Sequence, residues 1–183
     1  NIPIVIMNRQ VKNNTYSSVW FDHFQASTLA INHLLELGHT DIACITAATS
    51  SRTVQLRYKA FQTQLKKNKL TINKHIIATG DYTIEGGYEA CNKILAEKHP
   101  FTAIYAFNDD MAIGAIRALH DVGIRVPEQV SVIGIDNEPF GSFVTPSLTT
   151  VELPIKEITN AAMKIALDLA SGINMSRIET TFK

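Results

Sequence analysis

The feature that most limits the possible folds of this chain is a regular alternation of short apolar runs with longer amphipathic segments. The runs at 103–107 and 130–135 have the length and composition of buried strands, and 111–122 between them has helical spacing. Parallel strands need such a crossover, so the order predicts an α/β fold with parallel sheets flanked by helices. Further strands are expected at 2–7, 18–21, 41–46, 76–79 and 148–151, and further helices at 24–37, 54–65, 84–95 and 155–169.

Composition excludes several classes of protein. Lys+Arg and Asp+Glu both number 17, so no net charge would attract the chain to nucleic acid or to an anionic membrane. No apolar stretch is long enough to span a bilayer, and residues 1–4 resemble neither a signal nor a transit peptide. Cys44 and Cys91 lack C-x-x-C spacing, so we expect two buried, reduced thiols in a cytoplasmic protein.

Polar side chains follow several of the expected strands. Asn8, Asn108 and Asp136 each come directly after an apolar run, and Arg57 lies about one turn into a helix. Open parallel sheets bind ligands beyond the carboxyl ends of their strands. These donors and acceptors together suit sugar hydroxyls or another small polar metabolite. Taken singly, Asn108 and Asp136 are equally well explained as caps of the turns that follow them.

Two neighbouring features have more than one interpretation. Tyr82 is either an aromatic wall for a sugar ring or a half-buried loop tyrosine. Asp109 and Asp110 resemble a metal pair, but adjacent side chains diverge, so a helix N-terminus capped by Asn108 is favoured. The six histidines show no metal spacing, and the motifs of hydrolases, nucleotide-binding proteins and zinc proteases are missing. We therefore predict a binding module, not an enzyme, without cofactor or metal.

The expected helix at 111–122 is apolar over most of its circumference. A crossover helix on a sheet needs only one apolar stripe. The second apolar face would lie either against another subunit or lobe, or beneath a neighbouring helix.

Five motifs, spread over most of the chain, match one pattern in the same order. They are His-Leu-Leu-Glu-Leu-Gly-His at 33–39 with Ile42, Arg57 with Phe61, 108–115 (NDDMAIGA), 126–137 (VPEQVSVIGIDN) and 146–151 (PSLTTV). Together they resemble the effector-binding domain of the LacI/GalR family of bacterial transcriptional regulators. Asn8-Arg9 and the segment 19–22 are most similar to the galactose and β-glucoside repressor subset.

The resemblance implies a two-lobed fold like that of periplasmic sugar-binding proteins, with the effector in the cleft. The surfaces that form the family's homodimer correspond to Ile113, Phe143 and Val144 of this sequence. Its effector contacts correspond to Asn8, Thr53, Arg57, Tyr82, Asn108, Asp136 and Ile155.

The resemblance also implies a division of the chain. Residues 1–16 would be a remnant of the N-terminal lobe, 17–148 the C-terminal lobe, 149–173 a return to the N-terminal lobe, and 174–183 a return to the C-terminal lobe. The family's helix-turn-helix and the first units of its N-terminal lobe have no counterpart here, and its final strand is expected to be missing near 179–183. Operator DNA would then be bound by residues outside this sequence.

The predicted function is therefore sugar binding and homodimerisation in a LacI/GalR-type regulator. Different effector affinities of two lobe orientations would shift the DNA affinity of the helix-turn-helix. The alternative is a periplasmic-type sugar receptor for transport or chemotaxis, which predicts a secretory signal upstream. A third hypothesis, a sugar-metabolising enzyme with Asp109 or Asp136 as its base, has no nucleophile or cofactor motif to support it.

Overall fold

The computed structural model describes residues 2, 4–9, 16–48, 51–173 and 179–182, and the chain forms two compact units. The larger unit is His23–Glu152, and the smaller unit combines Asn1–Asp22 with Leu153–Lys183. The predicted α/β class, with parallel sheets and flanking helices, is confirmed. Among the described residues, no helix has both the length and the apolar character needed to cross a bilayer.

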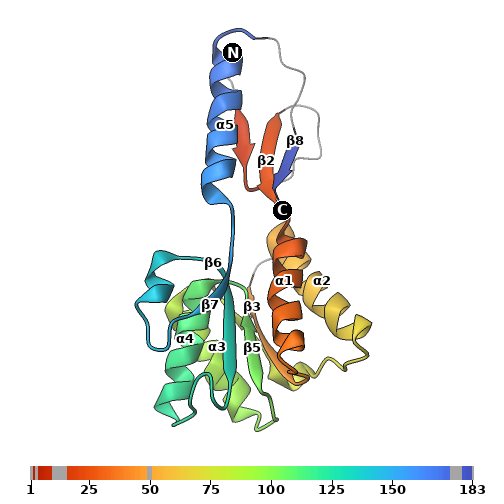
Figure 1. Cartoon of the computed structure of the whole chain (residues 1–183), viewed down its shortest axis with the longest axis vertical. Coiled ribbons are helices and arrows are strands. Elements are labelled where there is room, and N and C mark those ends of the chain that lie inside the picture. Colours follow the sequence, from red (N-terminus) through yellow and green to blue (C-terminus); the bar gives the residue numbers. More distant parts are fainter. Residues whose placement is uncertain (1, 3, 10–15, 49–50, 174–178, 183) are drawn as a thin grey trace. The chain divides into compact units, whose positions relative to one another are not determined.

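The larger unit is built on one parallel sheet with the strand order β4-β3-β5-β6-β7. Helices α1 and α2 cover one face of this sheet, and α3 and α4 cover the other (Figure 1). The strands are β3 (Ile42–Ala47), β4 (Ile77–Gly80), β5 (Ala103–Ala106), β6 (Ser131–Asp136) and β7 (Thr149–Glu152). The helices are α1 (His23–Glu36), α2 (Arg52–Lys67), α3 (Ile84–Ala96) and α4 (Asp109–Asp121), with short 3-10 turns η1 (Lys74–Ile76) and η2 (Pro139–Ser142).

Local sequence signals explain where these helices begin and end. Ser51, Thr83 and Asn108 each accept a hydrogen bond from the backbone N–H three residues later, as N-cap residues do. Gly38 follows α1 with φ +89°, and the N–H of His39 donates to the carbonyl of Leu34 at 3.1 Å. The expected C′ glycine therefore ends α1 in a conformation that other residues rarely adopt.

The broad apolar face of α4 is buried against α3 and the sheet. Glycines allow the two helix backbones to approach closely: a Cβ on Gly114 would overlap the carbonyl oxygen of Ile84, and one on Gly87 would overlap the backbone of Met111. Burial beneath a neighbouring helix, the second of the two alternatives, thus accounts for most of this face. Ile113 is half-buried.

The smaller unit contains a three-stranded parallel sheet with the order β1-β2-β8, against which α5 packs. Trp20 is half-buried here, and Val19 and Phe21 are buried. Its elements are β1 (Val5–Met7), β2 (Ser17–Phe21), α5 (Ile155–Ala170) and β8 (Glu179–Phe182).

Strand pairing places three segments differently from the expected division of the chain. β2, expected in the larger lobe, pairs with β1 in the smaller unit, and β8 forms where no strand was expected and pairs with β2. β7, expected to begin the return to the smaller lobe, is instead the edge strand beside β6. Backbone hydrogen bonds between strands that are far apart in the sequence determine which sheet each strand joins. The sequence pattern alone does not predict these pairings. The predicted boundary segments 10–15 and 174–178 lie outside the described residues.

Candidate functional site

The candidate site lies in the larger unit, at the carboxyl ends of its strands. β3 and β5 are neighbours in the sheet, but the helices that follow them, α2 and α4, cover opposite faces. Ligands of open α/β sheets bind at such a switch point. Arg57 of α2 and Asp136 at the end of β6 meet at this edge, with 3.4 Å between Nη2 and Oδ1. The structure thus joins two residues that are 79 positions apart and that the sequence assigned to one site.

Arg57 is a buried cation with unused hydrogen-bonding capacity. Its side chain is 4% exposed, and its Nη2 also lies 3.5 Å from Nδ1 of His23, the first residue of α1. Nε is buried and has no hydrogen-bond partner among the described residues. The 3.4 Å contact with Asp136 is longer than the usual 2.7–2.9 Å or so of a charge-assisted hydrogen bond. A buried guanidinium in this state gains free energy when a ligand supplies acceptors.

Asp136 and Tyr82 hold unusual backbone conformations at this edge. Asp136 has φ +134° and Tyr82 has φ +71°, although neither is glycine. Each such residue costs roughly 1–3 kcal/mol, and residues of this kind cluster at ligand-binding sites. Two of the sequence-predicted contacts therefore combine strain with polar side chains, which favours a binding role over a purely structural one.

Burial also changes the acid–base behaviour of Asp136. Its side chain is 24% exposed, and burial raises its pKa to about 6, although the positive charge of Arg57 acts in the opposite direction. The nearby carboxylate of Asp109 raises the pKa further. Near neutral pH Asp136 is thus ionised and able to accept hydrogen bonds from hydroxyl groups, and it becomes protonated in mild acid.

We predict that Asp136 makes the larger unit less stable as the pH rises from 4 to 7. A carboxyl with a raised pKa binds more protons in the folded than in the unfolded state, so its contribution to the free energy of unfolding falls as pH passes through the interval between the two pKa values. Urea titrations at several pH values should show that Asp136→Asn removes up to about 3 kcal/mol of this pH dependence. Equal pH slopes for wild type and variant would contradict the prediction.

Tyr82 and Asn108 lie beside the Arg57–Asp136 pair. Tyr82 is half-buried, and its pKa is raised by burial, while the charges of Arg57 and Asp136 act on its hydroxyl in opposite directions. Asn108 is nearly buried; its Oδ1 accepts from the N–H of Met111, and its Nδ2 donates to the carbonyl of Tyr82, both at 3.1 Å. Asn108 is therefore both a helix cap and the residue that holds the Tyr82 backbone in place.

Asp109 is a structural anchor next to the site rather than a free carboxylate. It is fully buried; Oδ1 accepts from the hydroxyl of Thr150 at 2.5 Å, and Oδ2 accepts from the N–H of Glu138 at 2.9 Å. A Cβ on Gly134 would overlap its carboxylate. Burial raises its pKa, and these hydrogen bonds lower it. Because both oxygens are engaged, the geometry gives no support to Asp109 as a base. The sequence did not predict the contributions of Thr150 and His23, which depend on distant packing.

The other predicted contacts are placed within their own units. Thr53 is half-buried in the first turn of α2, in the larger unit. Asn8 follows β1 in the smaller unit with φ +54°, and its N–H donates to the carbonyl of Val19 at 2.8 Å. Ile155, the first residue of α5, is 52% exposed. Among the predicted dimer residues, Phe143 is 81% exposed and Val144 is half-buried.

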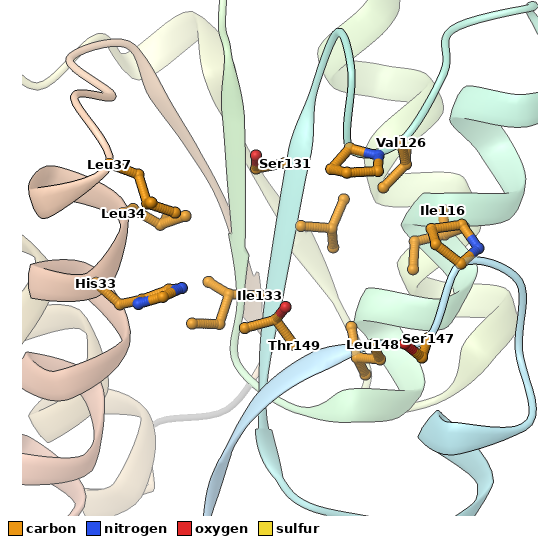
Figure 2. A pocket seen from close by; sticks show the side chains of 13 residues that line it. His33, Leu34, Leu37, Ile116, Val126, Ser131, Ile133, Ser147, Leu148 and Thr149 are labelled. Carbon is orange, nitrogen blue, oxygen red and sulfur yellow. The ribbon is translucent and has the colours of Figure 1, made fainter.

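A separate, mainly apolar hollow lies at the edge of the same sheet (Figure 2). β7 begins opposite Ile133, so the first two residues of β6 have no strand beside them at this edge. The hollow contains none of the predicted effector contacts. Its lining comprises His33, Leu34, Leu37, Ile116, Val126, Pro127, Ser131, Val132, Ile133, Pro146, Ser147, Leu148 and Thr149.

Comparison with known proteins agrees with this architecture. Residues 31–181 match the family described as periplasmic binding protein-like domain. The chain is 39% identical to the HTH-type transcriptional regulator AscG of Escherichia coli over 178 residues, which cover 97% of this chain and 53% of that protein. The chain thus spans about half the length of the curated relatives it matches.

Two solved structures extend the comparison. A sugar-binding transcriptional regulator of the LacI family from Escherichia coli, complexed with phosphate, has a TM-score of 0.89 and 35% identity and covers 99% of this chain and 66% of its own. A LacI-family regulator from Enterococcus faecium with bound ribose has a TM-score of 0.90 and 28% identity. The match covers 98% of this chain and 67% of that one. The chain therefore belongs to the family of periplasmic binding protein-like domains, as found in the effector-binding regions of LacI-family transcriptional regulators.

Proposed function

We propose that this chain is the effector-binding region of a LacI-type transcriptional regulator and that its effector is a small sugar. The observation that carries the proposal is the pairing of buried Arg57, which has an unbonded Nε, with the partly exposed carboxylate of Asp136. A guanidinium and a carboxylate side by side offer donors and acceptors that match neighbouring sugar hydroxyls. The ribose bound to the Enterococcus faecium relative supports a sugar as the ligand class.

The proposed contacts fall into two groups. In the larger unit, Arg57 and Asp136 would bind hydroxyls, Tyr82 would pack against a sugar ring, and Thr53 and Asn108 would complete the polar edge. In the smaller unit, Asn8 and Ile155 rest on the family resemblance alone.

Regulation of DNA binding would follow from an equilibrium between two conformations that bind the effector with different affinities. A ligand shifts such an equilibrium only when it binds one conformation more tightly than the other. Operator DNA would be bound by residues outside this sequence, in a cytoplasmic homodimer. Ile113, Phe143 and Val144 are the proposed dimer contacts, and the large exposed area of Phe143 supports its inclusion. The named relatives are regulators, which favours this role over that of a transport or chemotaxis receptor or an enzyme.

Calorimetric titration with a panel of pentoses, hexoses and β-glucosides tests the ligand class. We expect one sugar class to bind at a single site and to be recovered unchanged after prolonged incubation, because the chain acts as a binder. Nucleobases and amino acids provide the comparison set. Binding confined to that comparison set, or conversion of the sugar, would contradict the proposal. The coding sequence upstream separates the two roles: a helix-turn-helix supports the regulator, and a secretory signal supports the receptor.

A further inference from the structure

Three side chains with metal-binding atoms converge on the surface of the larger unit, away from the candidate effector site. His75 belongs to η1, and Glu97 and His99 follow α3. One ligand atom from each lies within 4.8 Å of the others, and all three residues are exposed. No spacing motif in the sequence connects them, because the fold brings 73–76 and 97–99 together.

Hydrogen bonds and ring stacking partly organise this cluster. Nδ1 of His75 lies 2.9 Å from Oε2 of Glu97, and the rings of His75 and His99 stack with centroids 4.3 Å apart. Asn73 contacts both histidines: its Oδ1 accepts from the backbone N–H of His75 at 3.0 Å, and its Nδ2 lies 3.5 Å from Nδ1 of His99. The contact with Nδ1 of His99 leaves Nε2 of that ring as its metal-binding atom, and the bond to the backbone of His75 fixes the position of η1.

The chemistry of the three groups is that of a zinc site. Two imidazoles and one carboxylate form a ligand set that binds Zn²⁺ and leaves a fourth position for water. With bonds of about 2.0–2.2 Å, tetrahedral ligand atoms are about 3.4 Å apart, so the present spacing of up to 4.8 Å must shrink by about 1.4 Å. The His75 side chain is 60% exposed and that of Glu97 is 51% exposed, which leaves both free to rotate by this amount.

The charges near the cluster favour a transition metal bound by imidazole over Ca²⁺ or Mg²⁺, which would need an acidic surface with several oxygen ligands. Lys74 and Lys93 line the shallow hollow next to His75 and Glu97, so the surface is not acidic. A surface of this kind disfavours Ca²⁺ and Mg²⁺, which need several oxygen ligands, whereas imidazole nitrogen binds Zn²⁺ well.

From this convergence we propose that His75, Glu97 and His99 bind one Zn²⁺ ion. The ion would replace the hydrogen bond between His75 and Glu97 and would connect η1, directly before the edge strand β4, to the end of α3. Metal bound to the folded state alone stabilises that state. The site would therefore stabilise the turn that directly precedes an edge strand of the sheet.

Titration of the untagged protein with ZnCl₂ by calorimetry tests this proposal. We expect one ion per chain with a micromolar Kd, and a rise in Tm of roughly 5–10 °C at a free Zn²⁺ concentration about 100 times Kd. MgCl₂ and CaCl₂ should produce neither effect. His75→Ala and His99→Ala should each weaken Zn²⁺ binding at least about tenfold, because losing a ligand should cost no less than losing an outer-shell partner of a ligand, which typically costs about 10–100-fold.

His120→Ala is the matched control. His120 is also exposed and lies beside a carboxylate, with 3.6 Å between its Nδ1 and Oδ1 of Asp121, but it belongs to no three-residue cluster among the described residues. Wild-type Zn²⁺ binding by this variant, together with the losses at His75 and His99, would support the site. Absence of any Zn²⁺ response in the wild type, unchanged binding by His75→Ala and His99→Ala, or an equal loss in His120→Ala would overturn it.

Discussion

Replacement of Arg57 by Ala is expected to weaken binding of the identified sugar by more than about 100-fold, which corresponds to about 2.7 kcal/mol. The substitution removes the donors that would meet the ligand and leaves the partly buried Asp136 without its positive partner. Truncating one member of a buried, hydrogen-bonded charge pair costs about 2–5 kcal/mol. Arg57→Lys should recover only part of the affinity, because an ammonium lacks the planar fork that contacts two acceptors at once. Calorimetry at a fixed pH of 7.5, where Asp136 is ionised, measures both effects.

Arg52→Ala is the matched control for this prediction. Arg52 is the first residue of the same helix, α2, and it is exposed, so its loss should leave sugar affinity within about twofold of the wild type. Circular dichroism and Tm separate loss of binding from loss of fold in the Arg57 variants. Wild-type affinity in Arg57→Ala would remove Arg57 from the proposed contacts and, with it, the main support for the site.

The sequence predicted the elements well because their signals are local. Asn108 and Asp136 were identified as site candidates by position alone, since the carboxyl end of a buried parallel strand is recognisable without knowing its neighbours. The structure adds the information that Asn108 also supports Tyr82 and caps α4, so its second amide hydrogen is the donor left for the proposed ligand contact.

Distant pairings could not be predicted from the sequence. β2 was assigned to the wrong unit because a short apolar strand pairs equally well with any partner until the fold supplies one. The burial of Asp109, the approach of His23 to Arg57 and the convergence of His75 with His99 likewise depend on packing between segments far apart in the chain. Side chains with no periodic or spacing signal are the ones that sequence reasoning missed.

Asp109→Asn is expected to have the largest effect on stability among the substitutions considered. The wild-type carboxylate accepts from the hydroxyl of Thr150 and the N–H of Glu138, so it links the start of α4 to β7 and to the segment after β6. An amide presents only one acceptor oxygen, so either its NH₂ group faces the N–H of Glu138, or the Thr150 hydroxyl stops donating and turns to accept from it. We expect the free energy of unfolding of the larger unit to fall by about 1.5–3 kcal/mol, as for the loss of a hydrogen bond to a charged group.

Asp110→Asn provides a matched control for this prediction in the same helical turn. Asp110 is only half-buried, and its charge contributes through the helix dipole, so its loss should cost about 0.3–1 kcal/mol. Thr150→Val should cost less than Asp109→Asn, and the two losses should not add in the double variant because they remove the same hydrogen bond. Urea unfolding followed by circular dichroism gives the free energy of unfolding of the wild type, the three single variants and the double variant. Equal losses for Asp109→Asn and Asp110→Asn would show that the charge at the helix N-terminus, rather than the buried link to β7, accounts for the stabilising effect of Asp109.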